Sequence, residues 1–125
     1  MEAATTGGAR RSRAQPQALE WQVDMLETLV AATFAVAVDE LRAGTRRSKP
    51  VAFARQSAMY LAHIALGLSY SQVGRIFGRD RTTAAHACRV IEERRDDPLL
   101  DLVLAALERT YDAVPEKAQG SRVLS

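Results

Sequence analysis

The chain has 125 residues, of which 47% are hydrophobic and 26% charged. These proportions are typical of a single globular domain and exclude a disordered, collagen-like or mucin-like protein. The longest apolar stretch, residues 29–38, is too short for a membrane span of about 20 residues, and residues 1–15 have no apolar core of a secretory signal.

The net charge of +2 hides an uneven distribution along the chain. Residues 42–89 contain nine basic side chains and one acid, Asp80, so this stretch carries +8 while the rest of the chain carries −6. A basic stretch inside an otherwise acidic domain is typical of a nucleic-acid-binding protein. Charge alone leaves a solvated basic face as an equal alternative.

The chain divides into three parts by composition. Residues 1–17 are rich in Gly, Ala, Thr and Arg, without hydrophobic periodicity, and we expect a flexible basic arm there. Residues 18–114 show helical periodicity throughout, and residues 115–125, with Pro115 and Gly120, are expected to form a flexible tail.

Helical spacing predicts the first elements of the body. Apolar residues recur at steps of three and four over residues 19–34, which indicates one face of a helix. A short helical piece over residues 37–41 and a basic loop over residues 45–49 follow. Pro50 suits the first turn of a third helix. We expect this helix to bury Val51, Ala54, Ala58, Leu61 and Ala65, and to turn Arg55, Gln56, Met59 and His63 to a different side.

The next two predicted helices are joined by a tight turn. Ser69 and Gln72 have the spacing of a capping box, Gly78 marks the turn, and Asp80 is a suitable N-cap for the helix that follows. A final helix is expected after Pro98, with Leu100, Val103, Leu107, Tyr111 and Val114 on its apolar face. A short helix, a glycine turn and a second helix over residues 69–95 form the helix-turn-helix pattern.

The sequence offers no pattern typical of an enzyme. It has no G-x-x-x-x-G-K-[ST] phosphate loop, so we expect no nucleotide binding and no ATPase activity. His86 and Cys88, two residues apart on a predicted helix, would face different directions. We therefore expect no metal, no cofactor and no catalytic residue, with Cys88 as a small core residue. This single cysteine also indicates a cytoplasmic protein without disulfides.

Several separate segments in one order resemble the C-terminal DNA-binding domain of the bacterial replication initiator DnaA. They are RRSK at 46–49, ARQSAMYL at 54–61, VGRIFGRDRTT at 73–83 and HACRVI at 86–91. The resemblance covers roughly residues 26–95 and implies an all-α, Trp-repressor-like helix-turn-helix domain of about five to six helices.

The resemblance also implies roles for individual positions. Arg47, in the basic loop, matches an arginine that enters the minor groove. Lys49, Arg55 and Gln56 match contacts to the DNA backbone, and Tyr70 and Ser71 begin the helix that touches the backbone and a nearby thymine. The segment that reads the major groove is matched by Asp80, Arg81, Thr82 and Thr83.

The chain departs from the family pattern at two positions. The family usually has two glycines before Arg-Asp, whereas only Gly78 precedes Arg79 and Asp80 here, which predicts a slightly shifted turn. The family has a histidine where this chain has Arg81. Since an arginine prefers guanine, we expect a preferred site that is related to the DnaA box but altered near that contact.

The chain therefore looks like a stand-alone DNA-binding module without the ATPase and assembly domains of DnaA. We expect a cytoplasmic, nucleoid-associated regulator of transcription or replication that binds double-stranded DNA and neither membranes nor nucleotides. Competition with the DnaA initiator for its sites is one possible role. The alternative is an adapter of the replication machinery that keeps the fold but binds a protein.

Overall fold

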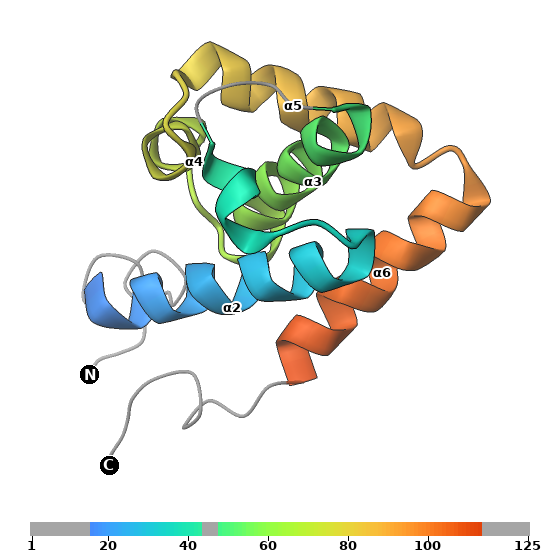
Figure 1. Ribbon diagram of the computed structural model, residues 1–125, viewed down its shortest axis with the longest axis horizontal. Helices are drawn as coiled ribbons and strands as arrows, with labels where there is room; N and C mark the ends of the chain where they lie inside the picture. The colour runs from blue at the N-terminus through green and yellow to red at the C-terminus, as the bar shows by residue number, and fades with distance from the viewer. Residues whose placement is uncertain (1–15, 44–47, 114–125) are drawn as a thin grey trace.

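The computed structural model describes residues 16–43 and 48–113. Within these ranges the chain forms five α-helices, one short 3-10 helix and no strand, which confirms the predicted all-α class (Figure 1). Their bounds are α2 Pro16–Phe34, η1 Val38–Arg42, α3 Lys49–Ala65, α4 Tyr70–Phe77, α5 Arg81–Arg94 and α6 Pro98–Ala113. None of the described helices is long and apolar enough to cross a membrane.

The first helix begins earlier than the predicted boundary between arm and body. α2 starts at Pro16, two residues before the expected start of the body at residue 18. A proline is tolerated in a first turn because its missing N–H has no intrahelical partner there. The remainder of the predicted arm, and the predicted tail over residues 115–125, lie outside the described residues. The expected short helical piece is confirmed as η1, which buries Leu41.

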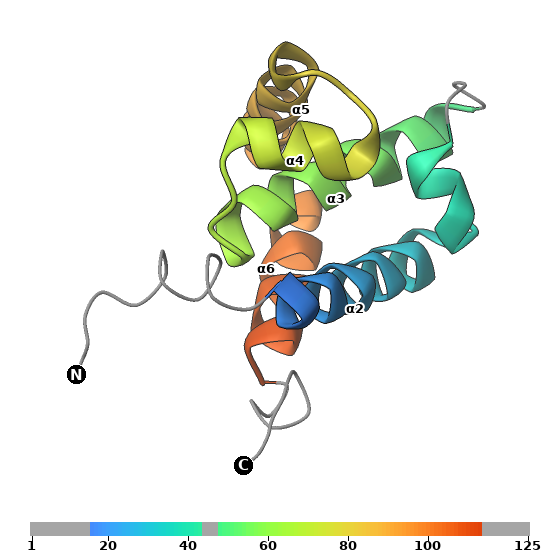
Figure 2. The same ribbon diagram turned by 90° about the vertical axis from the view of Figure 1, so that its left-hand side faces the viewer.

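Helix α3 is the centre of the core and packs against every other described helix. It lies between α2 on one side and the α4–α5 pair on the other in two perpendicular views (Figures 1 and 2). Because α3 is surrounded by the other helices, it buries more of its circumference than the single apolar stripe that the sequence predicted. Met59 and Arg55, expected on a different side, are 2% and 5% exposed.

The predicted helix-turn-helix is confirmed in detail by its caps. The Ser69 hydroxyl accepts a hydrogen bond from the Gln72 N–H, and the Gln72 side chain accepts one from the Ser69 N–H, so the capping box is complete. Gly78 ends α4 with φ +67°, a left-handed conformation that favours glycine. Asp80 then caps α5, accepting a hydrogen bond from the Thr83 N–H at 2.8 Å.

The last helix returns across α2 and α3. It is fixed to α5 by Arg95, whose guanidinium contacts Asp101 at 2.6 Å, Glu108 at 2.9 Å and the Tyr60 hydroxyl at 3.1 Å. The predicted apolar face of α6 is displaced towards Leu104, which is fully buried although it was not expected there. The α6 packing thus completes the core on the side away from α4 (Figure 2).

Candidate nucleic-acid interface

The exposed start of α5 carries the side chains that were predicted to read DNA bases. Arg81, Thr82 and Thr83 are all exposed in the first turn of this helix. Asp80, just before them, has its carboxylate turned to the helix it caps, and the hydrogen bond from the Thr83 N–H holds the pKa of that carboxyl below its usual range. Asp80 therefore sets where α5 begins, and so how residues 81–83 are presented.

Close packing between α4 and the turn fixes the direction of α5. Gly74 lies so near the turn that a β-carbon on it would meet the Arg79 carbonyl oxygen at 2.6 Å. The Arg79 N–H donates to the Gly74 carbonyl at 2.8 Å across the same contact. Only a residue without a side chain permits this approach.

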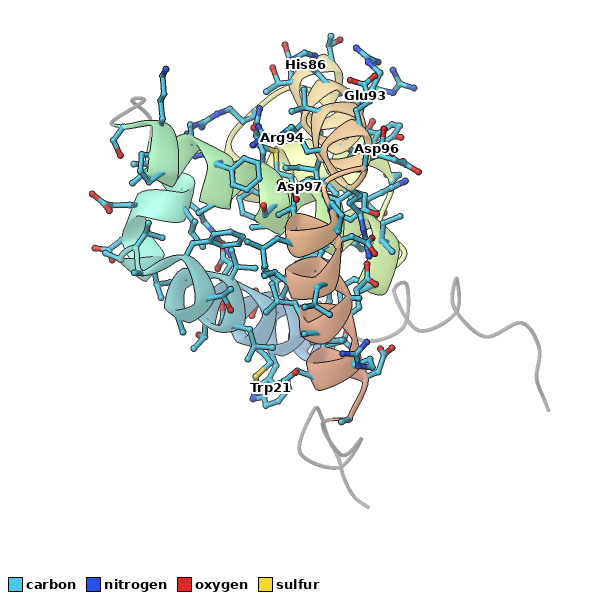
Figure 3. The ribbon with its side chains drawn as sticks, turned by 90° about the vertical axis from the view of Figure 1, so that its right-hand side faces the viewer. Trp21, His86, Glu93, Arg94, Asp96 and Asp97 are labelled. Carbon is cyan, nitrogen blue, oxygen red and sulfur yellow. The ribbon has the colours of Figure 1, made fainter. Side chains whose placement is uncertain are left out.

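A groove of about 690 Å³ runs between the N-terminal half of α3 and α5, from the turn before α5 to Arg94 at its end. Among the described residues, no acid lines it. Its lining brings together four predicted contacts, Lys49, Arg55, Gln56 and Thr83. It also includes residues of α5 and the turn that were not predicted to take part in the site, among them Arg79, His86 and Arg94. Figure 3 shows His86 and Arg94 on α5, and the guanidinium of Arg94 lies 4.9 Å from the centre of the Phe53 ring of α3.

Arg55 lines the same groove, but its guanidinium forms hydrogen bonds with main-chain carbonyls of the protein. Its side chain is 5% exposed, and it donates from Nε to the Leu41 carbonyl and from Nη2 to the Glu40 carbonyl, both at 3.0 Å. A predicted phosphate contact at this position would have to use the small part of the guanidinium that reaches the groove. The geometry is better suited to holding the segment that precedes the basic loop.

Two further arginines hold that segment. Arg79 donates from Nη2 to the Ala43 carbonyl at 2.9 Å and from Nη1 to the Phe77 carbonyl at 3.1 Å. Arg42 is paired with Glu27 of α2, with a shortest contact of 2.6 Å. The end of η1 is thereby joined to α2, to α3 and to the helix-turn-helix at once.

The remaining predicted contacts lie in different places. Ser71 is exposed on α4, while Tyr70 is partly buried and stacks on His63 with 4.4 Å between ring centres. Arg47, the predicted minor-groove residue, lies outside the described residues. Arg79 and His86 lie within the sequence segments that resemble the family, so the sequence did point to this region. That both residues line one groove depends on how α3 packs against α5, which the sequence alone does not give.

The described residues contain no cluster of His, Cys, Asp or Glu that could hold a metal ion. Cys88 is buried, as expected of a core residue, and burial raises the pKa of its thiol to about 11. Its Sγ faces the Met59 carbonyl at 3.9 Å. The thiol is thus protonated at neutral pH and unsuited to act as a nucleophile.

A short capped helix, a glycine turn and a second helix with an exposed first turn define a helix-turn-helix domain. The family model for the bacterial DnaA protein helix-turn-helix matches residues 23–91. The chain therefore belongs to the DnaA helix-turn-helix family, and the predicted resemblance is confirmed.

Curated relatives are chromosomal replication initiator proteins named DnaA. One, DnaA 1 of Protochlamydia amoebophila, is 42% identical over 72 residues, which are 58% of this chain and 16% of the relative. Another, from Thermomicrobium roseum, is 36% identical over 115 residues, which are 90% of this chain and 23% of the relative. The chain thus spans about a fifth of the length of these relatives.

Proposed function

We propose that the chain binds double-stranded DNA in a sequence-specific manner, at sites related to the DnaA box. The observation that carries this proposal is the exposed first turn of α5, with Arg81, Thr82 and Thr83, beside a basic groove in which no described residue is acidic. In helix-turn-helix proteins the start of the second helix meets base edges in the major groove. The groove between α3 and α5 suits the adjoining phosphates, and Arg47 is proposed for the minor groove.

The biological role that we propose is regulation of transcription or replication in the cytoplasm, in association with the nucleoid. Competition with the DnaA initiator for shared sites would follow from similar site preferences. Selection of bound duplexes from a random pool tests the proposal directly. A recurring motif related to the DnaA box supports it, whereas an absence of enrichment at low salt favours the alternative, an adapter that binds a protein.

Phosphate contacts in the groove predict a strong dependence on salt. We expect Lys49→Ala to weaken binding to all duplex sequences alike and to flatten the slope of log K against log salt by about 0.9, the contribution of one phosphate contact. Lys49 is exposed, so the unfolding free energy should stay unchanged. Fluorescence anisotropy over a salt series measures the slope, and an unaltered slope removes Lys49 from the interface.

Arg55→Ala is the informative comparison for that experiment. It removes a buried side chain that donates to the carbonyls of Leu41 and Glu40. The Glu40 carbonyl keeps the Ala43 N–H as a donor, whereas loss of the donor to the Leu41 carbonyl costs about 1–3 kcal/mol. We therefore expect a clear loss of stability in denaturant titration. If Arg55→Ala instead flattens the salt slope without any loss of stability, Arg55 is a phosphate contact, as the sequence predicted.

The sequence of this chain contains no phosphate loop, and we propose that its DNA binding is independent of nucleotide. Duplex affinity should be the same with and without ATP or ADP, and the purified chain should not hydrolyse ATP. Anisotropy and phosphate release measure the two properties. Hydrolysis that co-purifies with the chain through successive columns would contradict this part of the proposal.

A further inference from the structure

Two of the three buried polar or charged side chains in the described part of the chain bind one short segment, η1. The three are Glu27, Arg55 and Ser57, which are 4%, 5% and 0% exposed. Arg55 donates to two main-chain carbonyls of η1. Glu27, on α2, binds the side chain of Arg42, the last residue of η1. Burial of a charged side chain is unfavourable unless it is paired, so two costly core positions hold this segment.

The contact between Glu27 and Arg42 fixes a direction as well as a distance. Arg42 donates from Nε to Oε2 of Glu27 at 2.6 Å and from Nη2 to Oε1 at 3.0 Å, which is a two-pronged arrangement. The guanidinium carbon of Arg42 also lies 6.0 Å from the centre of the ring of Phe77, the buried last residue of α4. Arg42 is therefore held between α2 and the end of α4, next to the turn that leads to α5.

An ion pair with a buried carboxylate adds little stability, because the loss of hydration offsets most of the attraction between the charges. An apolar pair of similar volume often stabilises a core equally well. The planar guanidinium adds orientation instead, since its fork binds a carboxylate in one geometry, which neither a lysine nor an apolar side chain reproduces. Glu27 and Arg42 are thus suited to fixing the position of the segment that follows them.

That segment leads from η1 towards the basic loop. Ala43 follows Arg42, its carbonyl accepts a hydrogen bond from Arg79 at 2.9 Å, and Arg47 lies four residues further along the sequence. We infer that Glu27 and Arg42 form a positioning pair, which sets where the chain leaves η1 relative to α5 and thereby aligns the minor-groove contact with the major-groove contact. This inference rests on the proposed duplex binding by Arg47 and α5.

The consequence is a preference for particular base pairs at one end of the DNA site. The minor groove distinguishes A·T from G·C pairs and little else, so an arginine held in register there favours A·T. The pair of Glu27 and Arg42 touches no DNA in this account. It determines specificity at the Arg47 end of the site and leaves the bases read by α5 unaffected.

The experiment removes the pair without leaving a buried charge. Arg42→Ala alone would leave the Glu27 carboxylate in the core without its partner, which is strongly destabilising. The test variant therefore combines Glu27→Leu with Arg42→Met, and circular dichroism and Tm check that it folds. Anisotropy measures the affinity of the full chain for a selected duplex and for derivatives in which one A·T pair at a time is replaced by G·C.

For the natural chain, a replacement at the Arg47 end should weaken binding roughly 5- to 150-fold, the usual effect of one mismatched base pair. Arg47→Ala and the Glu27→Leu, Arg42→Met variant should both bring this ratio close to one and keep the base preferences at the α5 end. In an Arg47→Ala background, removal of the pair should not change the ratio further, because both changes act through one contact. Arg42→Lys, which keeps the charge without the fork, should also lower the ratio.

Arg95→Met is the matched control. Arg95 also binds two carboxylates, Asp101 and Glu108, but these belong to α6, so the variant should lower Tm and leave the base preferences at both ends unchanged. The inference is overturned if the folded double variant or Arg42→Lys keeps the A·T preference, if the preferences at both ends disappear together, or if the natural chain binds duplexes without an A·T preference at the Arg47 end. Absence of duplex binding by the natural chain overturns the proposed function, and this inference with it.

Discussion

Gly74→Ala is expected to destabilise the domain and to weaken its binding to DNA. The added methyl would lie 2.6 Å from the Arg79 carbonyl oxygen and 3.0 Å from two atoms of Asp80, all of them backbone. Alanine improves helix propensity by about 0.5–1 kcal/mol, but overpacking of this kind costs about 1–3 kcal/mol. The steric cost should prevail because a backbone turn, unlike a flexible side chain, cannot swing aside.

The loss of stability should lower Tm by about 4–8 °C for each kcal/mol in a domain of this size, which calorimetry measures. The displaced turn carries Asp80, the N-cap of α5, so the folded variant should also bind duplexes more weakly. Gly67→Ala is the matched control: Gly67 has φ +71° and open space around it. Gly67→Ala should lose stability through backbone strain but bind duplex DNA as tightly as the natural chain. If folded Gly74→Ala also binds as tightly as the natural chain, this account is wrong.

The features that the sequence predicts well are those that depend on near neighbours in the chain. The capping box at Ser69 and Gln72 and the N-cap at Asp80 are contacts between residues three apart, so they can be recognised from spacing alone. The turn at Gly78 follows for the same reason. The all-α class and the helix-turn-helix are built from such local signals.

Arg55 shows why other features could not be predicted. Its partners, the Leu41 and Glu40 carbonyls, lie 14 and 15 residues earlier in the chain. Nothing in the local pattern distinguishes an arginine that supports the fold from one that is free to bind a phosphate. His86 is a similar case, because its membership of the groove depends on the packing of α5 against α3. Leu104 was missed because the rotation of α6 is set by α2 and α3.

Arg81→His is expected to change which DNA sites the chain prefers. Arg81 is the first residue of α5 and is exposed, so the substitution should leave the fold intact. A guanidinium can donate two hydrogen bonds to O6 and N7 of guanine, and such a pair discriminates between bases by about 1–3 kcal/mol, or roughly 5- to 150-fold. The natural chain should therefore select a site shifted towards guanine near that contact, and the variant a site nearer to the ordinary DnaA box.

The competing possibility is that Arg81 turns to a phosphate, where it would add affinity without sequence information. Site selection with both proteins separates the two, because a phosphate contact leaves the selected motif unchanged and alters the salt slope instead. Arg75→His, the same substitution at an exposed arginine of α4, controls for the loss of a positive charge and should leave the motif as it is. If Arg81→His and the natural chain select one motif, Arg81 does not read a base. If the motif moves only with Arg81→His, this single side chain accounts for a difference in target sites within the family.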